Sequence, residues 1–393
     1  MKQSNKDVPK IVLGHSYWGR GGAEIATMWL IQALCPHYEI DIVTRGGWDL
    51  AALNRCAGTT VQPHDLGRLI RPHFVPANIT LGGAIWHSAF LRFCSRIGSD
   101  YDIRISASRV IDWGAPAVHF LTDVVWNEEL ATRFGEPEQE GPRIWPREIL
   151  NSIAKRLRPP TQHYARQGDV FVANSNWTAS ISSKYCARYP EVIYPPVFDL
   201  SPSTAWSDRL ASVVCLGRLS PEKRIEEVIE IIAQIRARGH NVHLHLVGES
   251  DRPDYEEAIR ALASKYAQWI TLHGALYGED KAKLLSKCRF GISACTRESF
   301  GMATAEMVKS GMIVFVPSSG GQREIVRDPS LMFQSNTDAV RKIGRVLSSE
   351  SLQHRLSDSL LEQGKRFGVQ PFSTSILNLM NRIRDDARGT KTV

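Results

Sequence analysis

The sequence predicts an α/β protein of two domains, each built on a parallel sheet with helices on both faces. Short apolar β patterns alternate along the chain with segments in which apolar residues recur at the helical period. This alternation runs once up to Pro195-Pro196 and then starts again. The 393 residues, 43% hydrophobic and 23% charged, are ordinary for a globular protein and long enough for two domains. Together these observations predict two Rossmann-like domains.

The first half begins with a β pattern at 10–14, a Gly-rich turn and an apolar-periodic helix at 23–34. Further strands are predicted at 39–44, 59–65, 102–107, 117–121, 169–173 and 191–194. Further helices are predicted at 49–56, 81–97 and 147–164, and from a cap near 174–176. Pro195-Pro196 ends this half, because neither proline can donate to a strand ladder and each pushes the preceding residue to extended geometry.

The second half repeats the alternation. Strands are predicted at 212–216, 242–247, 270–273, 290–294 and 313–316, and helices at 222–238, 255–266, 280–287 and 304–309. Gly239 is a suitable residue to end the helix 222–238, and a last helix at 373–384 follows a break at Pro371. We therefore expect an N-terminal domain over 1–198, a C-terminal domain over 199–365, and a segment 366–393 that crosses back to the N-terminal domain.

Composition excludes several classes of protein. Lys plus Arg (48) against Asp plus Glu (41) gives +7, which is shared almost evenly between the halves, so no nucleic-acid-binding domain or tail is expected. The seven cysteines are scattered and contain no C-x-x-C pair, which indicates neither a disulfide framework nor a zinc site. With no signal-peptide core at the N-terminus and no long apolar run, we expect a cytoplasmic protein.

A loop that could bind an anion follows the first strand of each half. Gly19-Arg20-Gly21-Gly22 opens a helix and offers backbone N–H groups suited to an anion such as a diphosphate, although a Gly pair is often merely a turn. In the second half Arg218 is expected to end a strand, and Lys223 to lie in the first turn of the next helix. Cations are unfavourable at a helix N-terminus, which indicates a bound anion. The alternative is two solvated surface charges, which is the commoner fate of a lysine.

The most specific pattern is the pair Glu298 and Glu306, separated by seven residues. Glu298 lies in a strand-to-helix loop, Gly301 permits close backbone approach, and Glu306 lies within the following helix. Two carboxylates so placed can accept hydrogen bonds from the paired hydroxyls of a sugar or ribose, whereas loop N–H groups suit phosphate oxygens. A second Gly-rich loop at 318–326 repeats this arrangement.

Taken together, these motifs resemble the retaining nucleotide-sugar glycosyltransferases of family 4, from residue 10 to about 326. The resemblance implies the GT-B fold, with two Rossmann-like domains facing each other across a deep cleft. It also implies the roles of single residues. Arg218 and Lys223 would hold the donor diphosphate, with Gly21 and Gly22 completing the phosphate site from the other domain. Glu306 would bind the ribose hydroxyls and Glu298 the sugar hydroxyls, and the backbone of Ser299, Phe300 and Gly301 would approach both. His119, expected at the end of its strand, matches the active-site histidine near the donor sugar; without the resemblance, a core histidine is the simpler interpretation.

Three local segments, at 119–122, 174–178 and 193–196, are similar to mannosyltransferases that extend lipid-linked oligosaccharides with GDP-mannose. The resemblance therefore implies transfer of a hexose to a glycan or lipid-linked acceptor and favours GDP-mannose, while a UDP-sugar stays open. Alternatives are a nucleotide-sugar hydrolase or epimerase and an inactive nucleotide-sugar-binding protein. A dinucleotide oxidoreductase is disfavoured because G-x-G-x-x-G is missing.

No second carboxylate at nucleophile spacing is evident in the N-terminal half, so a front-face retaining mechanism is expected. No D-x-D-like motif is present where a metal would bridge the phosphates, so metal independence and no further cofactor are expected. Two basic stretches of the N-terminal domain, 86–97 and 143–166, could meet anionic lipid at the inner face of a membrane. Equally, they could be helices with solvated outer faces.

Overall fold

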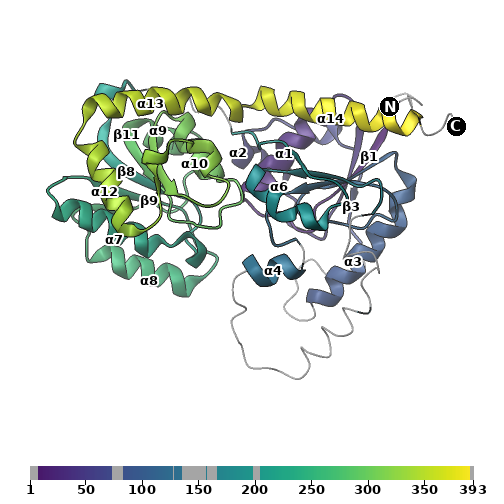
Figure 1. The fold of residues 1–393 in the computed structure, drawn as a ribbon. Helices are drawn as coiled ribbons and strands as arrows, with labels where there is room; N and C mark the ends of the chain where they lie inside the picture. The colour runs from purple at the N-terminus through teal and green to yellow at the C-terminus, as the bar shows by residue number, and fades with distance from the viewer. Residues whose placement is uncertain are drawn as a thin grey trace. The chain divides into compact units, whose positions relative to one another are not determined.

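The computed structural model describes residues 8–72, 83–126, 128–134, 156, 166–197 and 204–389. The chain divides into two compact units (Figure 1). Unit 1 comprises Met1–Tyr194 with Phe372–Val393, and unit 2 comprises Pro195–Pro371. Each is an α/β unit with a parallel sheet, as the sequence predicts.

The sheet of unit 1 has the strand order β3-β2-β1-β4-β5-β6-β7, and every neighbouring pair is parallel. Its strands are β1 (Lys10–Gly14), β2 (Glu39–Val43), β3 (Leu69–Ile70), β4 (Ile103–Ser106), β5 (Val118–Leu121), β6 (Val170–Ala173) and β7 (Glu191–Val192). The strand order reverses between β1 and β4. In sheets of this kind ligands bind beyond the carboxyl ends of the strands at such a reversal.

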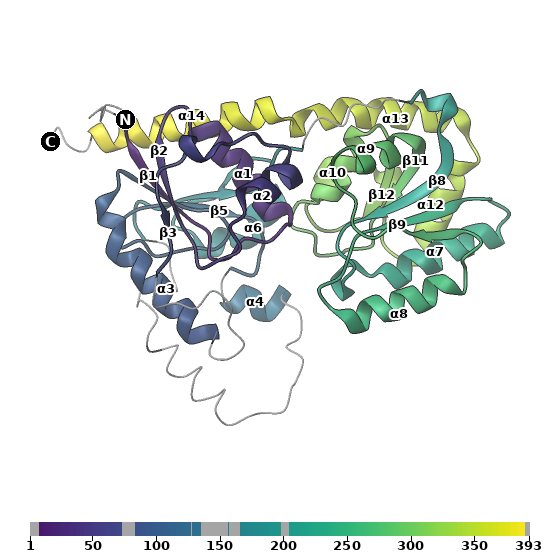
Figure 2. The same ribbon diagram turned by 180° about the vertical axis from the view of Figure 1, so that it is seen from behind.

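The helices described in unit 1 are α1 (Gly22–Leu34), α2 (Leu50–Ala57), α3 (Gly83–Ile97), α4 (Glu128–Phe134) and α6 (Asn176–Ser182). Right-handed crossovers place α1 and α2 on one face of the sheet and α3 on the other, and the two views in Figures 1 and 2 show these helices around the strands. On the α3 side, Phe90, Leu91 and Cys94 pack against Val12 and Val43. This packing buries the apolar stripe of α3.

Unit 2 has the strand order β10-β9-β8-β11-β12-β13, which reverses between β8 and β11. The strands are β8 (Leu210–Leu216), β9 (His243–Val247), β10 (Ile270–Leu272), β11 (Cys288–Ile292), β12 (Ile313–Pro317) and β13 (Met332–Phe333). The helices are α7 (Ile225–Ala237), α8 (Pro253–Ser264), α9 (Gly278–Lys287), α10 (Met302–Lys309), α11 (Arg323–Val326), α12 (Asn336–Leu347) and α13 (Glu350–Gly364). The last helix, α14 (Val369–Gly389), belongs to unit 1 from Phe372 onward.

Two predicted elements are wrong. Residues 59–65 form no strand: Pro63–Asp65 is a short 3₁₀ turn, and the edge strand is instead β3. Pro63 has no N–H to donate to a ladder, which favours the turn. Pro371 does not break the last helix either. It lies in the first turn of α14, where backbone N–H groups have no intrahelical acceptor and a proline costs little.

The helix predicted at 222–238 begins later than expected. Pro221–Lys223 forms a 3₁₀ turn, Arg224 has φ 54°, and α7 starts only at Ile225. The left-handed residue Arg224 separates the turn from the helix, so Lys223 is not in the first turn of α7, which instead holds Glu226 and Glu227. The predicted ending is confirmed, since Gly239 has φ 91° just after α7. The helix predicted at 147–164 lies outside the described residues, apart from position 156.

Candidate functional site

In unit 2, the loop after β8 places Arg218 two residues beyond the strand rather than at its end. Gly248, just after β9, packs against this loop: a Cβ atom there would lie 1.9 Å from the carbonyl oxygen of Gly217. Arg218 is half-exposed, and its guanidinium contacts Glu222 at 2.8 Å and Asp251 at 3.4 Å. Such exposed ion pairs are weak, so this guanidinium can exchange partners readily.

Lys223 and Glu298 come from the loops after β8 and β11, on either side of the strand-order reversal. Lys223 Nζ lies 2.5 Å from Glu298 Oε2, and each side chain is about three-quarters buried. Burial lowers the pKa of Lys223, but the neighbouring Glu298 carboxylate outweighs it, and the net pKa is raised. Lys223 therefore stays charged and is paired with the Glu298 carboxylate.

The loop that carries Glu298 is held by backbone contacts. Gly301 has φ 104° and caps α10, a conformation that disfavours any residue with a side chain. Gly321 N donates to the carbonyl oxygen of Glu298 at 2.7 Å. Gln322 is fully buried, and its Nε2 donates to the carbonyl oxygen of Cys295 at 2.6 Å. The loop at 318–326 thus fixes the position of the loop that carries Glu298. The glycines of the sequence do not predict this contact.

Ser299, Phe300 and Gly301 are placed differently within this loop. The Phe300 ring is buried and packs edge-on against Phe367, at 5.4 Å between ring centroids. Its side chain is therefore part of the core, which leaves the backbone as the part of Phe300 that can face a ligand.

Glu306 lies in α10, as the sequence predicts, and its partner is Lys281 in α9. Lys281 Nζ contacts Glu306 Oε1 at 2.7 Å, and each side chain is 14% exposed. Lys281 is a site residue that sequence reasoning missed, because a lysine in a helix is ordinarily solvated. The predicted carboxylates of unit 2 thus each pair with one lysine.

In unit 1, Gly21 and Gly22 lie at the start of α1, after β1 and next to the strand-order reversal. Gly21 N donates to Glu24 Oε2 at 2.9 Å, which caps the helix. The predicted anion site therefore already contains a carboxylate, and the amide of Gly21 is occupied by it.

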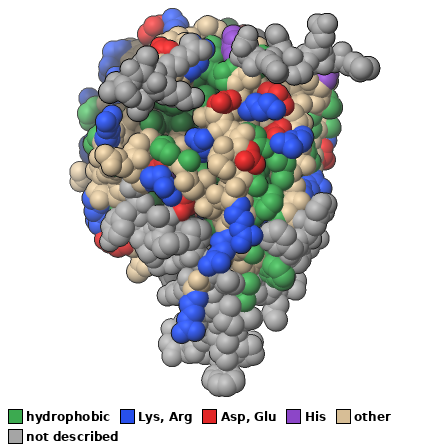
Figure 3. All heavy atoms as spheres, turned by 90° about the vertical axis from the view of Figure 1, so that its right-hand side faces the viewer, with side chains coloured by type: hydrophobic (Ala, Val, Ile, Leu, Met, Phe, Trp, Pro, Cys, Tyr) green, Lys and Arg blue, Asp and Glu red, His purple; other side chains and the backbone are tan. Residues whose placement is uncertain are grey.

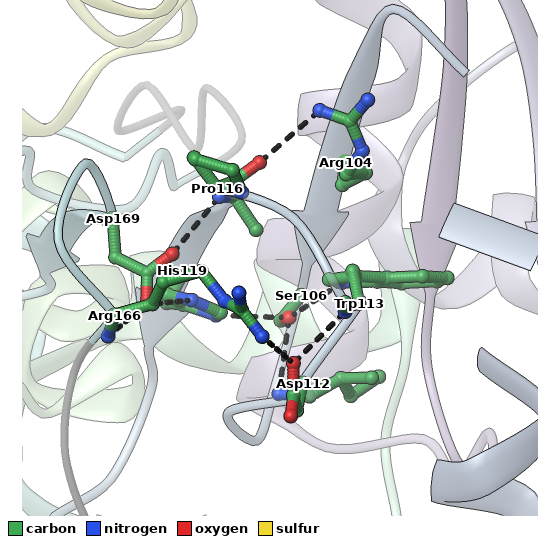
Figure 4. Close-up of polar contacts among 11 residues, drawn as sticks. Arg104, Ser106, Asp112, Trp113, Pro116, His119, Arg166 and Asp169 are labelled. Carbon is green, nitrogen blue, oxygen red and sulfur yellow. Dashed lines mark hydrogen bonds and ion pairs between the residues drawn. The ribbon is translucent and has the colours of Figure 1, made fainter. Parts of the chain in front are cut away.

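His119 is the second residue of β5, so the prediction that it ends the strand is wrong. Its Nδ1 lies 3.0 Å from Ser106 Oγ and its Nε2 lies 3.4 Å from Asp169 Oδ2, as Figure 4 shows. Ser106 Oγ also accepts a hydrogen bond from Trp113 Nε1. With His119 only 2% exposed, both ring nitrogens face buried partners. This environment favours a core histidine, and the active-site role stays a prediction.

Asp123 lies just beyond the carboxyl end of β5, closer than His119 to the edge where ligands bind. Burial raises the pKa of Asp123, against the opposing effects of the Val125 amide and Arg109. A single Asp in an apolar strand-to-loop segment gives no sequence signal, and no function is assigned to Asp123.

Within the described ranges, no three His, Cys, Asp or Glu side chains gather closely enough to hold a metal ion. No helix in the same part of the chain is long and apolar enough to span a membrane. All seven cysteines are free thiols.

The surface proposed for lipid contact is described only in part. Phe90 and Leu91 of α3 are buried, whereas Arg92 and Arg96 are exposed. In Figure 3, which draws one face of the molecule, Lys and Arg side chains form a line on the lower half of that face. Of the predicted basic stretch 143–166, only Arg156 and Arg166 are described, and Arg166 pairs with Asp112 at 3.2 Å.

Residues 199–360 match the family described as "Glycosyl transferases group 1". The chain is 29% identical over 105 residues to the uncharacterized glycosyltransferase YqgM of Bacillus subtilis, covering 27% of this chain and 29% of that protein. It is 29% identical over 172 residues to the GDP-Man:Man(3)GlcNAc(2)-PP-Dol alpha-1,2-mannosyltransferase of Eremothecium gossypii, covering 39% and 29%. It is 24% identical over 169 residues to the GDP-mannose-dependent alpha-mannosyltransferase of Mycobacterium tuberculosis, covering 42% and 38%. The matched segments thus span about a third of each relative's length.

Solved structures resemble the chain over nearly its whole length. Sucrose-phosphate synthase from Thermosynechococcus elongatus has a TM-score of 0.71 at 18% identity, covering 96% of this chain and 100% of its own. HepE from Anabaena, in complex with UDP and glucose, has a TM-score of 0.67 at 16% identity, covering 95% and 99%. The protein thus consists of two parallel-sheet α/β units that match the fold of solved GT-B glycosyltransferases, and its residues 199–360 match the glycosyl transferases group 1 family.

Proposed function

We propose that this protein is a retaining, family 4 glycosyltransferase that moves a hexose from a nucleotide sugar to a hydroxyl of a glycan or lipid-linked acceptor. The observation that carries the proposal is the contact between Lys223 and Glu298 at the strand-order reversal of unit 2, with Arg218 in the same loop as Lys223. Lys223 and Glu298 meet there at 2.5 Å, within the segment that matches the group 1 family.

The donor diphosphate is assigned to Arg218 and Lys223. Both are cations beyond β8, and each is held by carboxylates whose place phosphate oxygens can take. When a diphosphate replaces Glu298 as the partner of Lys223, the Glu298 carboxylate becomes available to sugar hydroxyls. The backbone of Ser299, Phe300 and Gly301 lies beside it. Binding of the diphosphate to Lys223 and binding of the sugar hydroxyls to Glu298 are therefore coupled.

Glu306 is assigned to the ribose hydroxyls, with Lys281 holding one of its oxygens. Because Lys281 engages Oε1, the second carboxylate oxygen is the one assigned to a hydroxyl donor. In unit 1, the amide of Gly21 already donates to Glu24 Oε2 at 2.9 Å, so the donor phosphates are assigned to unit 2 and not to Gly21 or Gly22.

GDP-mannose is the proposed donor. The local similarity to mannosyltransferases supports it, as do two relatives whose names specify GDP-mannose or GDP-Man. A UDP-sugar is the second candidate, favoured by the structural neighbour HepE, which was solved with UDP and glucose. A thermal-shift comparison of GDP with UDP distinguishes the two, since the matching nucleotide raises Tm more at equal concentration.

The proposed mechanism is a front-face transfer. The bond from the anomeric carbon to the diphosphate breaks, and the acceptor oxygen forms its bond on the same face. The acceptor proton passes to the departing phosphate oxygen, and Arg218 and Lys223 stabilise the charge that develops there. These cations supply the neutralisation that a divalent metal supplies elsewhere, so metal-independent turnover is proposed.

Acceptor-dependent release of nucleoside diphosphate tests the proposal. A glycosyltransferase releases GDP or UDP faster when a glycoside acceptor is present, and the sugar is recovered on that acceptor. A hydrolase or epimerase would act on the nucleotide sugar at the same rate without acceptor. An inactive binding protein would show a thermal shift with nucleotide and no release.

A further inference from the structure

The loop between β1 and α1 contains a buried histidine whose ring makes no hydrogen bond. His15 follows β1 directly and is 2% exposed, and neither ring nitrogen has a hydrogen-bond partner among the described residues. An unsatisfied buried polar group costs about 1–3 kcal/mol, so it is retained in a native structure for a reason. The Nε1 of Trp18, which stacks on His15 at 4.3 Å, is buried and unpartnered as well.

His15 faces the carboxylate at the start of α1. Its Nε2 lies 3.6 Å from Glu24 Oε1, just beyond hydrogen-bond distance. The other oxygen of Glu24 accepts from Gly21 N at 2.9 Å. The Glu24 side chain is 15% exposed, so a ligand can reach it, whereas His15 lies behind it. The Glu24 carboxylate is thus accessible to a ligand, and the His15 imidazole lies on its buried side.

The charge of this pair decides which ligand suits it. Burial lowers the pKa of His15, against the opposing effects of Glu24 and the Tyr17 backbone, so the imidazole stays neutral near pH 7. Among the described residues, no Lys or Arg pairs with the Glu24 carboxylate. A carboxylate accepts hydrogen bonds from hydroxyls and repels phosphate, and the neutral imidazole can donate to it.

We propose that Glu24 is the residue of unit 1 that binds a sugar hydroxyl of the acceptor, and that His15 is the positioning residue that orients the Glu24 carboxylate. The inference rests on the proposed function, which it deepens by specifying the acceptor at this point as a neutral, hydroxyl-bearing glycan. A hydroxyl that donates to Glu24 Oε1 draws the carboxylate toward one defined rotamer, and His15 Nε2–H donates to it from behind.

The test separates acceptor kinetics from donor kinetics. Glu24→Gln keeps an oxygen that can cap α1 and removes the charge, since Gln is tolerated at this capping position. Transfer from GDP-mannose and from UDP-glucose to methyl α-D-mannopyranoside and methyl β-D-glucopyranoside is measured for wild type, Glu24→Gln and His15→Gln. Glu39→Gln is the control, because Glu39 is an exposed residue at the start of β2, paired with Lys10.

For Glu24→Gln, kcat/KM for the acceptor is expected to fall about 10- to 100-fold, as for loss of a hydrogen bond to a charged group. The KM for the donor and the affinity for GDP or UDP are expected to stay within about twofold of wild type. His15→Gln leaves Glu24 in place and should lower the same acceptor parameter by a smaller factor, about three- to tenfold, for loss of one neutral hydrogen bond. The control should match wild type.

An unchanged acceptor kcat/KM in both variants would overturn the proposal. A parallel loss of GDP or UDP affinity would also overturn it, because Glu24 would then belong to the donor site. If Glu24→Gln fails to fold, His15→Gln decides by the same comparison. Wild-type protein that binds GDP or UDP but neither transfers to nor binds either glycoside contradicts the hydroxyl site, whereas failure to bind any nucleotide contradicts the proposed function instead.

Discussion

At the residue scale, the proposed donor site depends on two carboxylates, Glu298 and Glu306, that each pair with a lysine. In Glu306→Ala, Lys281 loses its partner at 2.7 Å, and a bound ribose would lose its hydroxyl acceptor. We expect nucleoside diphosphate affinity to fall about 10- to 100-fold, measured by isothermal titration. Glu257→Ala, an exposed glutamate on α8, is the matched control and should bind like wild type. Equal affinities for all three proteins would remove Glu306 from the site.

Arg218 gives a different signature, because its ion pairs with Glu222 and Asp251 are exposed and weak. We expect Arg218→Ala to lower kcat by about 10²- to 10³-fold, the scale for losing one group that stabilises developing charge. Donor KM should change much less. Steady-state kinetics with varied donor measure the split, and a loss confined to KM would mean that Arg218 only binds.

The sequence predicted correctly in which element a residue lies where the local pattern decides it. Glu298 and Glu306 follow from their places in one loop and one helix. Lys281 could not be predicted as a partner because it meets Glu306 from a separate helix 25 residues away, and His15 could not because the fold of the β1–α1 loop brings it to Glu24. The active-site role of His119 was predicted from resemblance. Its contacts with Ser106 and Asp169 join three separate segments of the chain, so the sequence could not predict them.

At the element scale, the end of β8 is shaped by Gly248. A Cβ at this position would lie 1.9 Å from Gly217 O, and its φ of 150° is unfavourable for a side chain. Gly248→Ala should therefore destabilise unit 2 and displace the loop that carries Arg218. Gly239→Ala is the matched control, because its φ of 91° carries strain while nothing lies within 4 Å of its Cβ.

We expect Gly239→Ala to cost about 1–2 kcal/mol and to leave nucleotide affinity unchanged. Gly248→Ala should cost more and weaken nucleotide binding. Chemical denaturation and titration measure the two effects, and equal values for the two variants would mean that the loop tolerates the added atom.

Three histidines on β9 and beside β10 make the stability of unit 2 sensitive to acid. His245 Nδ1 lies 3.0 Å from His273 Nε2, and the His243 ring packs on His245. Burial, followed by the charges of His243 and His273, lowers the pKa of His245 to about 4. The unfolded chain, with an ordinary pKa of 6.5, binds more protons between these values, so stability is lost as pH falls from about 6.5 toward 4.

His245→Phe should therefore reduce the loss of stability between pH 7 and pH 5. Urea unfolding at the two pH values measures it. An unchanged difference would mean that other groups carry the acid sensitivity of the protein.

Element prediction missed two long helices, α12 with 12 residues and α13 with 15, and it also failed where backbone geometry decided. Most strands and helices of both sheets lie within a few residues of their predicted places. Arg224 adopts a left-handed conformation that the sequence Pro-Glu-Lys-Arg does not predict. This conformation makes α7 begin later than expected. Short elements such as β13 and α11 are fixed by tertiary packing rather than by local pattern.

At the scale of the whole molecule, only part of the net charge of +7 has a proposed role. Arg218 and Lys223 are assigned to a diphosphate, and Arg92 and Arg96 are exposed on α3. If this surface meets anionic lipid, the protein should sediment with phosphatidylserine-containing vesicles at low salt, and Arg92→Gln with Arg96→Gln should weaken that binding. Absence of wild-type binding would leave α3 as a helix with a solvated outer face.

The proposed reliance on Arg218 and Lys223 for charge neutralisation predicts that turnover is independent of divalent metal. Activity after exhaustive treatment with EDTA should remain within about twofold of that of the untreated protein, because the two cations assigned to the diphosphate would neutralise its charge. Loss of activity that Mg²⁺ or Mn²⁺ restores would contradict this proposal.

The most direct test of the central claim is acceptor-dependent sugar transfer by the full chain, followed by NMR of the product anomer. GDP-mannose, with UDP-glucose in parallel, is incubated with and without methyl α-D-mannopyranoside, and nucleoside diphosphate release is quantified. The account predicts release that increases with acceptor and a product that keeps the anomeric configuration of the donor. Acceptor-independent release, or a product of inverted configuration, would contradict it.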